Sequence, residues 1–350
     1  MPADLPENLE SLEVLEENQD LYEHHRIVAD KGQGLLRIDK FLMVRLENAS
    51  RNKIQQAAHA GNILVNNKAV KPNYRVHPND VISVVLSHPP REIEIISENI
   101  PVEIIYEDAD ILIVNKQAGM VVHPAYGNYT GTLVNSLAYH LQNVSPDKEP
   151  GRLPFLVHRI DKDTSGVMIV CKNELSQARM AAQFFHHTID RHYMALVWGD
   201  LKEDSGTITG HIGRSTRDRK IFTVYPDGST GRHAVTHYSV VERFSYVTLV
   251  DCKLETGRTH QIRVHFQHIK HPLFGDETYG GNWILKGTTF SKYKHFVENC
   301  FEILPRQALH ARTLAFAHPA TGQWMEFQSP LPHDFQTVLD KWRRYKTTEV

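Results

Sequence analysis

A polar stretch with one prominent carboxylate lies near the middle of the chain, within residues 156–172 (LVHRIDKDTSGVMIVCK). Asp161 follows Arg159 by two residues, and a neighbouring guanidinium helps to keep a carboxylate ionised at neutral pH. An ionised aspartate that the fold holds in place can act as a nucleophile or as a general base. Asp161 is therefore the first candidate for chemistry in this chain.

Three interpretations of D-K-D-T-S-G compete. In a simple β-hairpin, the Asp and Ser side chains bond only their own backbone. The same letters match the first half of an EF-hand calcium loop, but the twelfth position, where that loop requires a bidentate Glu, is Lys172. The third interpretation is catalytic, with Asp161 as the reactive group. The residues of this stretch alone do not decide between the hairpin and the catalytic site.

Residues 158–166, HRIDKDTSG, resemble the H-R-[LI]-D-x-x-T-S-G signature of the RluA/RluD-type pseudouridine synthases. The resemblance implies that Asp161 is the one indispensable carboxylate. It also implies that Arg159 fills the space left in the RNA when the target base is flipped out, and stacks there. Flipping costs a few kcal/mol, which contacts with the RNA must offset.

Two further segments resemble the same family in the same order. The strand RHYMALVWG carries Tyr193, in the place of a family tyrosine that lies against the target base. A Tyr there can stack on uracil and manage a ring proton through its hydroxyl. The run TGRTHQIRVH carries Arg263, in the place of an arginine that pairs with the catalytic Asp. A planar guanidinium, always protonated, suits that task because it can hold a carboxylate ionised and aimed.

The elements that must position these residues are legible in part. The pattern predicts a strand, a tight connection and a strand across residues 156–172, which places Asp161 at a strand end. It also predicts a helix in 131–141, a helix in 173–189, a strand ending at Gly199, two final strands and a closing helix. We expect an α+β fold with a mixed, mostly antiparallel central sheet flanked by helices. Residues 282–304 match no part of the pattern and are expected to be an insertion.

The segment before this region predicts a small RNA-binding module. Leu35, Ile38 and Leu42 have helical spacing, Ser50 is a good N-cap for a second helix, and Gly61 is a good stop. The order of motifs resembles the S4 domain, a small α/β unit, although Asn67 stands where that family usually has Gly. Asn tolerates the left-handed conformation that the turn requires. The residues expected to touch phosphate are Arg37, Arg51 and Lys53.

Charge is distributed unevenly along the 350 residues, although the net charge is only −2. Residues 1–30 hold nine acidic residues and one Arg, whereas residues 31–91 hold ten basic and three acidic residues, a net charge of +7. A cationic module of this size is typical of proteins that bind RNA, although a merely solvated basic face has the same composition. The expected domains are an acidic tail (1–32), mobile or forming a short surface helix, an S4-like domain (33–92) and a catalytic domain (93–350), with a Pro89-Pro90-Arg91 linker.

Other classes of function find little support. No apolar run approaches the roughly 18 residues of a membrane span, and the N-terminus lacks a signal-peptide pattern, so we expect a cytoplasmic protein, acting as a monomer. The three Cys are far apart, which suggests neither disulfides nor a zinc knuckle. The motifs predict neither a cofactor nor a metal. Four histidines lie close enough in sequence to be considered as metal ligands, but their spacing does not follow H-E-x-x-H: His260, His265, His268 and His271.

The sequence thus predicts an isomerase that converts specific uridines to pseudouridine in structured RNA. The S4-like module and the sequence of residues 119–125 (GMVVHPA) favour large-subunit ribosomal RNA over transfer RNA as the substrate. Alternatives are a non-catalytic RNA-binding or ribosome-assembly factor, a synthase acting on transfer RNA, and a metal-dependent hydrolase using the histidines. The sequence does not indicate which uridines react. It also leaves open whether Asp161 attacks C1′, attacks C6 or takes a ribose proton.

Overall fold

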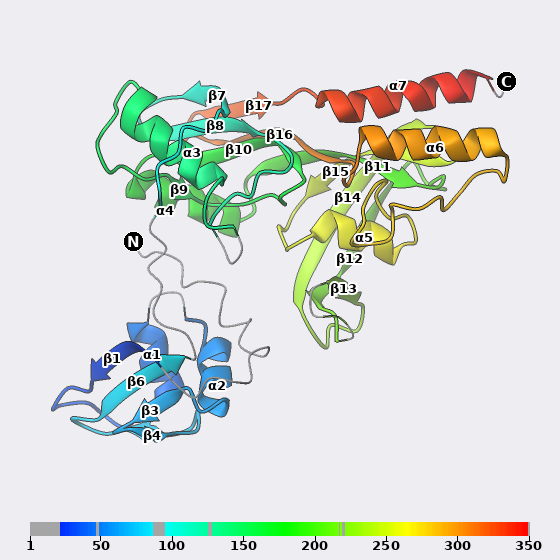
Figure 1. Cartoon of the computed structure of the whole chain (residues 1–350). Helices are drawn as coiled ribbons and strands as arrows, with labels where there is room; N and C mark the ends of the chain where they lie inside the picture. Colours follow the sequence, from blue (N-terminus) through cyan, green and yellow to red (C-terminus); the bar gives the residue numbers. More distant parts are fainter. Residues whose placement is uncertain are drawn as a thin grey trace. The chain divides into compact units, whose positions relative to one another are not determined.

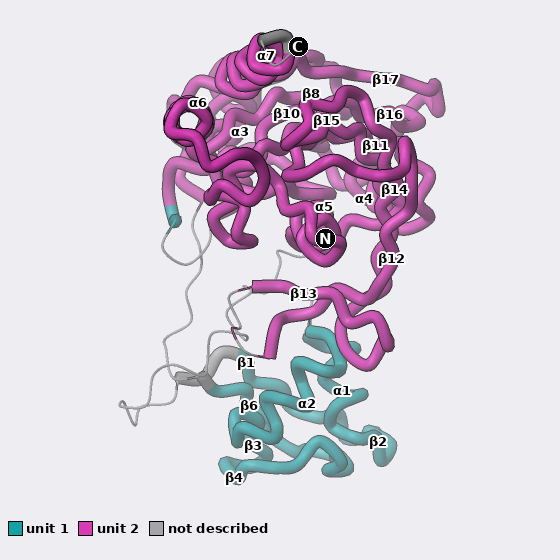
Figure 2. Tube along the Cα trace, turned by 90° about the vertical axis from the view of Figure 1, so that its right-hand side faces the viewer, with its two compact units in different colours: residues 1–94, 125–129 teal, residues 95–124, 130–350 magenta. Residues whose placement is uncertain are grey.

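The computed structural model describes residues 22–46, 49–86, 95–124, 128–216, 218 and 221–348. The chain divides into two compact units, residues 1–94 with 125–129 and residues 95–124 with 130–350 (Figure 2). Each unit has its own apolar core. No helix in the described ranges is long and apolar enough to cross a membrane. The expected Pro89-Pro90-Arg91 linker lies outside the described residues.

The first unit is a small sheet with two helices. Its antiparallel sheet has the order β1 (Tyr22–Val28), β6 (Val81–Leu86), β3 (Ile63–Val65), β4 (Lys68–Ala69), and a short pair joins β2 (Leu36–Arg37) to β5 (Arg75–Val76). The helices are α1 (Ile38–Arg45) and α2 (Arg51–His59). Apolar side chains from both helices and from β3 and β6 form the core of this unit.

Several local predictions for this unit are confirmed. Ser50 caps α2, its side chain accepting from the backbone N–H of Lys53, and Gly61 follows the helix at φ +79°. Asn67 adopts the left-handed conformation at φ +63°. One detail was wrong: Leu35 is exposed and lies before α1, because Arg37 is still in extended conformation and pairs in the β2–β5 ladder.

The expectation of a mobile or helical tail is wrong for Tyr22–Val28. This segment is strand β1, which pairs antiparallel with β6 along its length, with a bulge between Glu23 and His25. An edge strand needs only its backbone to pair, so its polar side chains hid it from a pattern based on hydrophobicity. Residues 1–21 lie outside the described residues.

The second unit is built on a large sheet with helices on both faces (Figure 1). Within the described residues it has eleven strands, and β10 and β16 pair in parallel while the other pairs are antiparallel, as predicted. The order is β13 (Phe222–Tyr225), β12 (Ser205–Arg214), β14 (Arg232–Arg243), β15 (Val247–Leu254), β11 (Asp190–Trp198), β16 (Leu309–Ala317), β10 (Ser165–Cys171), β8 (Ile111–Lys116), β7 (Glu103–Glu107), with β17 (Trp324–Gln328) beside β16 and β9 (Phe155–Leu156) beside β10.

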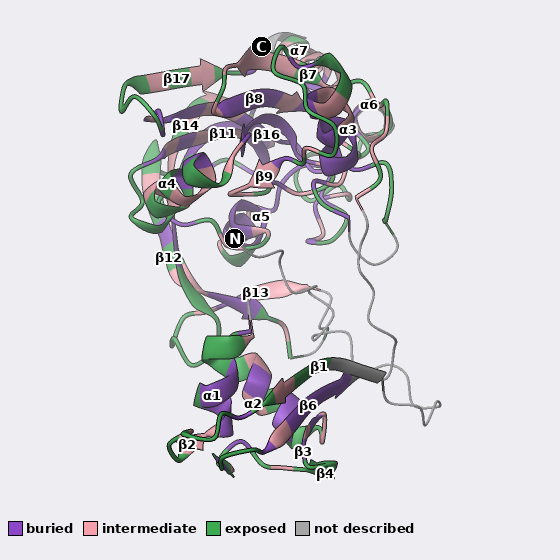
Figure 3. Ribbon diagram, turned by 90° about the vertical axis from the view of Figure 1, so that its left-hand side faces the viewer, coloured by how far each residue is buried: buried purple, intermediate pink, exposed green. Residues whose placement is uncertain are grey.

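Alternation along β11 assigns its residues to two cores. Tyr193, Ala195 and Val197 belong to a core that includes residues of α3 (Leu133–Tyr139), α4 (Glu174–Phe185) and α5 (Gln261–His268). Leu196 and Trp198 face a second core formed with α6 (Ser291–Ile303) and α7 (His333–Thr348). The segment expected to be an insertion therefore contributes α6 to this core. Figure 3 shows the central strands buried between these layers.

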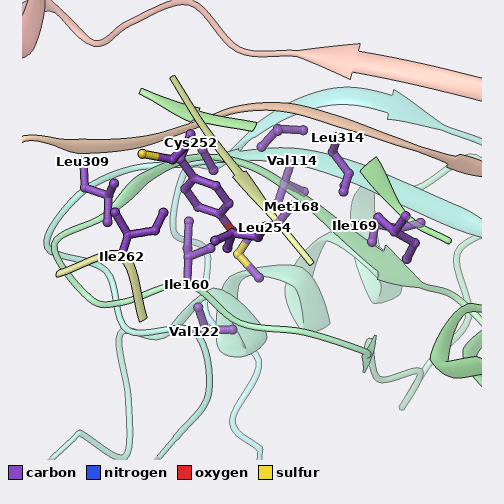
Figure 4. Packing of buried hydrophobic residues seen from close by; sticks show 14 of the residues in the cluster. Val114, Val122, Ile160, Met168, Ile169, Cys252, Leu254, Ile262, Leu309 and Leu314 are labelled. Carbon is purple, nitrogen blue, oxygen red and sulfur yellow. The ribbon is translucent and has the colours of Figure 1, made fainter. Parts of the chain in front are cut away.

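The core fixes the two ends of the predicted ion pair. Ile160 directly precedes Asp161, and Ile262 directly precedes Arg263. These two isoleucines are 6% and 3% exposed and belong to one apolar cluster. Figure 4 shows both beside Leu254 and Leu309. Because close-packed side chains resist displacement, this packing restrains the backbone that carries Asp161 and Arg263.

Candidate active site

A pocket of about 480 Å³ opens in the second unit on the face that carries Tyr193. Five segments line it: the loop between β9 and β10, the C-terminal end of α4 with the start of β11, the end of β15, the loop into α5 with the first turn of that helix, and the start of β16. The lining residues used below are Val157, His158, Arg159, Asp161, Phe184, Arg191, Tyr193, Gly257, Arg258 and His260. The pocket thus gathers Asp161, Arg159 and Tyr193 from separate parts of the chain.

Asp161 occupies a loop rather than a strand end. Strand β9 ends at Leu156 and β10 begins at Ser165, so the predicted strand–connection–strand order holds, but the connection is longer than predicted. The connection is long because β9 pairs with the far end of β10, at Val170 and Cys171. The eight residues between the strands form a loop along the pocket, and the side chain of Asp161 there is 21% exposed.

The backbone around Asp161 is held by two long cationic side chains. Buried Lys116 donates from Nζ to the carbonyl of Lys162 at 2.9 Å, and Arg306 donates from Nη1 to the carbonyl of Asp163, also at 2.9 Å. Lys116 also donates to two carbonyls of its own loop. Burial lowers the pKa of Lys116 to about 7, whereas the nearby carboxylates of Asp163 and Asp161 favour its charged form. The sequence alone suggested no role for this lysine, which lies in the run NKQAG, residues 115–119.

The predicted pairing of Asp161 with Arg263 is present. Arg263 donates from Nη1 to Oδ2 of Asp161 at 3.0 Å, across 102 positions in the sequence. Arg263 is buried, and burial alone lowers its pKa. Its contacts with Asp276 and Asp161 outweigh that effect and raise the pKa further above the usual range. The guanidinium therefore stays charged and keeps a positive charge against the carboxylate of Asp161.

Asp276 is a partner that sequence reasoning missed. Its side chain is fully buried and accepts from Nε of Arg263 at 2.7 Å and from Nη2 at 2.9 Å. This two-point grip turns the third nitrogen, Nη1, toward Asp161, because the guanidinium is planar and its donors have fixed directions. The signal in the sequence was weak: an acidic residue thirteen positions after Arg263, in the run LFGDETYGG (residues 273–281).

Tyr193 lies in β11, paired with Cys252 of β15 and Ala311 of β16. It is 7% exposed and lines the pocket. Burial raises its pKa, Arg191 lowers it, and Asp161 raises it, with a net upward shift. The hydroxyl therefore remains protonated at neutral pH, and the ring offers an apolar face to the pocket near Asp161.

His260 completes the surroundings of Asp161. Its backbone is left-handed, at φ +55°, and its Nε2 lies 3.9 Å from Oδ1 of Asp161. Its Nδ1 is 2.8 Å from the hydroxyl of Tyr279. Burial lowers the pKa of His260 despite the opposing charge of Asp161, so the ring is neutral at pH 7 and adds a polar but uncharged wall.

The mouth of the pocket is cationic. Arg159 is exposed there, and Arg191 and Arg258 also line the pocket, whereas Asp161 is the carboxylate among the lining residues. Arg263 is shared by Asp161 and Asp276, so these three buried or half-buried groups carry one net negative charge, and the three arginines outweigh it and give the pocket a positive field. Such a field attracts a polyanion.

The three S4-like site residues lie in the first unit. Arg37 and Arg51 each bond the buried carboxylate of Asp39, at 3.0 Å to Oδ2, while their own side chains are 41% and 46% exposed. Burial raises the pKa of Asp39, but hydrogen bonds from Gln55, Arg51 and Arg37 lower it to about 2. The two arginines thus have a structural role besides any contact with phosphate. Lys53 is half-buried at the start of α2.

The histidines of the α5 region have separate protein partners. His260 contacts Tyr279, His265 contacts Thr236, and His271 contacts the carbonyl of Trp198. Among the described residues, three metal-ligating side chains come together in Asp108, Asp110 and His318. Hydrogen bonds already occupy that grouping, including one between His318 and Asp108 at 2.9 Å.

Known proteins match both units. The profile of the family described as RNA pseudouridylate synthase matches residues 110–268, and that of the S4 domain matches residues 36–82. An uncharacterised RNA pseudouridine synthase of Chlorobaculum parvum is 47% identical over 319 residues, which cover 91% of this chain and 97% of that protein. Ribosomal large subunit pseudouridine synthase D of Pseudomonas aeruginosa is 38% identical over 312 residues, covering 88% and 92%.

A solved structure also resembles the chain. Human RNA pseudouridylate synthase domain containing 4 is 24% identical, with a TM-score of 0.52, over 69% of this chain and 93% of that one. At this level of identity the likeness concerns the fold alone.

Proposed function

This chain belongs to the RNA pseudouridylate synthase family, and we propose that it isomerises uridines of structured large-subunit ribosomal RNA at Asp161. The observation that carries the assignment is the ion pair at the pocket, where Arg263 holds Asp161 at 3.0 Å. The enzyme is accordingly an isomerase acting on RNA.

The conversion of uridine to pseudouridine is an isomerisation, so it consumes no second substrate. The N1–C1′ bond of uridine breaks, the uracil turns, and C5 joins the same ribose carbon, while a proton leaves C5 and another is gained at N1. No electron is gained or lost. One ionised carboxylate can begin the sequence, either by attacking carbon or by removing a ribose proton. Asp161 supplies that carboxylate.

The remaining pocket residues bind and orient the base. The target uridine leaves the RNA stack to reach Asp161, because a stacked base cannot enter the pocket. The ring of Tyr193 stacks on the uracil, and its protonated hydroxyl can exchange a ring proton. Arg159, exposed at the mouth, occupies the space that the uridine leaves.

The choice of substrate rests on two arguments. The P. aeruginosa relative is named a synthase of the large ribosomal subunit and matches most of both chains. The S4 unit adds a cationic module with Arg37, Arg51 and Lys53, which suits the backbone of a large folded RNA. No membrane partner is needed, and a single chain holds every group of the proposed site.

The test of the chemistry is Asp161→Asn. The amide is nearly isosteric but is neither a nucleophile nor a base, so the variant should bind RNA and form no pseudouridine. Asp163→Asn is the matched control, because it changes the same group two positions away and does not line the pocket. The readout is sequencing of RNA from a strain lacking the protein, complemented by each variant, after chemistry that marks pseudouridine.

Product from the Asp161→Asn strain would refute the assignment. If the wild-type protein bound the RNA but left it unmodified, the protein would instead be a non-catalytic RNA-binding factor. Modified positions confined to transfer RNA would keep the reaction and replace the substrate.

The S4 unit is tested by Lys53→Gln, assayed for RNA binding across a salt series. Loss of one phosphate contact should lower the slope of log affinity against log salt by about 0.9 and leave the turnover of bound RNA unchanged. Lys294→Gln, an exposed lysine of α6, is the control. An unchanged slope for Lys53→Gln would remove Lys53 from the RNA-binding surface.

A further inference from the structure

Arg191 is a buried cation that has no counter-charge among the residues that the structure describes. It is 8% exposed in β11, two residues before Tyr193, and both side chains line the pocket. Among the described residues, no carboxylate pairs with its guanidinium and no acceptor bonds it, and its Nε is buried without a partner. Its contact is the ring of Phe184, whose centroid lies 5.3 Å from Cζ.

The other buried arginines show the contrast. Arg263 is bonded by Asp276 and Asp161, and Arg306 by Asp334 and backbone carbonyls. A buried charge that lacks such partners is strongly destabilising, so folds do not retain one without a reason. No described residue supplies the missing negative charge at Arg191, and a bound anion can supply it.

A second buried donor belongs to a residue that lines the same pocket, His158. Nε2 of His158 accepts from the backbone N–H of Ile169 at 3.0 Å, so the proton of the neutral ring is on Nδ1. That N–H has no acceptor among the described residues. The His158 ring stacks on Phe184 with centroids 4.9 Å apart, which places it against the same ring as Arg191. Arg191 and His158 therefore both contact the ring of Phe184, and both residues line the pocket.

The chain also leaves room for this arrangement. A Cβ atom at position 257 would lie 2.9 Å from Nη1 of Arg191, so the glycine of the TGRTH run lets the guanidinium occupy its place. Among the described residues, Asp161 is the one carboxylate that lines this pocket, and it already accepts from Arg263.

We infer that Arg191 and His158 form a phosphate subsite, which binds a phosphodiester group of the RNA next to the flipped uridine. A phosphate supplies the negative charge that Arg191 lacks and several acceptor oxygens, whereas the uracil ring is neutral and cannot compensate the charge. The subsite would draw the flipped nucleotide in by its backbone while Tyr193 and Asp161 handle the base. The inference deepens the proposed function and rests on it for the identity of the ligand.

Binding is measured with RNA that cannot be turned over. The parent is Asp161→Asn, and the probe is unmodified large-subunit ribosomal RNA transcribed in vitro. Adding Arg191→Gln should weaken binding roughly tenfold to a hundredfold at low salt, the range of one charge-assisted contact, and lower the salt slope by about 0.9. Arg343→Gln is the control, because Glu242 and Asp340 already neutralise that guanidinium. Parent-like affinity and slope in the Arg191→Gln variant would overturn the inference.

Inorganic phosphate tests the subsite without RNA. At roughly ten times its Kd, phosphate should raise the Tm of the wild type by about 3–6 °C more than chloride of equal ionic strength. The Arg191→Gln variant should lose that difference and Arg343→Gln should keep it. Equal effects of phosphate on wild type and Arg191→Gln would count against the subsite.

A purely structural role gives opposite results. Replacing an uncompensated buried charge by an apolar chain in Arg191→Met should leave Tm unchanged or raise it, while RNA binding weakens. A fall in Tm of roughly 6 °C or more with unaltered RNA affinity would make Arg191 structural and overturn the inference. None of these measurements depends on turnover, so they stand apart from a failure of the isomerase assignment.

Discussion

The grip of Asp276 on Arg263 gives the sharpest prediction about the site. In Asp276→Asn the side chain keeps its shape but loses its charge and one of the two acceptors at 2.7 and 2.9 Å. Arg263 then remains buried with Asp161 as its single anionic partner. The amide nitrogen also meets a guanidinium N–H, which is a donor facing a donor.

The expected magnitude follows from burial. Asp276 is 0% and Arg263 6% exposed at the side chain, so solvent does little to screen the loss. Removing one partner of a buried pair costs about 3–5 kcal/mol, and the retained contact with Asp161 places this case near 3 kcal/mol. For a unit of this size that is a fall in Tm of roughly 6–12 °C.

Activity should fall as well. With one hydrogen bond left, Asp276→Asn no longer fixes the direction of Nη1, and Asp161 loses its alignment. A loss of one such contact corresponds to at least about a tenfold fall in kcat. The KM for RNA should stay the same, because Asp276 does not line the pocket.

The assay combines thermal unfolding with steady-state pseudouridine formation. Asp204→Asn is the matched control: it removes the same charge from an Asp–Arg pair at 2.7 Å, but the Asp204 side chain is 89% exposed. No measurable change is expected there. If Asp276→Asn behaved like this control in both Tm and kcat, the buried pairing would not be what positions Arg263.

Two further predictions concern stability. In Gly166→Ala, at φ +122°, the new Cβ would lie 2.2 Å from the carbonyl oxygen of Ala311 where β10 and β16 pair in parallel, so the free energy of unfolding in urea should fall by at least about 3 kcal/mol. The control Gly322→Ala, at φ +73° with no atom within 4 Å, should lower it by only about 1 kcal/mol. Equal losses in the two variants would contradict the role of close approach. Burial lowers the pKa of His265 and of His310 to about 4. The unfolded chain therefore binds more protons between pH 6.5 and about 4, and stability should fall across that window by up to about 3 kcal/mol per histidine. A His310→Gln variant should show a shallower fall, and an unchanged slope would exclude His310 as a source.

The sequence alone determined the features that depend on near neighbours. Ser50 as a cap, Gly61 as a stop and the left-handed Asn67 concern hydrogen bonds and dihedral angles within a few residues, so local pattern predicts them. In the second unit, α3, α4, α7 and β11 follow in the same way from the periodicity of apolar residues, whereas α6 lies in the segment that matched no pattern. The ordered motifs around Asp161, Tyr193 and Arg263 also indicated the family before any geometry was known.

Tertiary structure decided where charge is compensated. Asp161 pairs with Arg263, 102 positions away in the sequence, because the preceding residues Ile160 and Ile262 pack into one core. Only the folded chain shows that Asp276 pairs with Arg263 and that no described carboxylate pairs with Arg191. Burial and counter-charges are set by atoms distant in sequence, and local patterns carry no information about which of those atoms will meet.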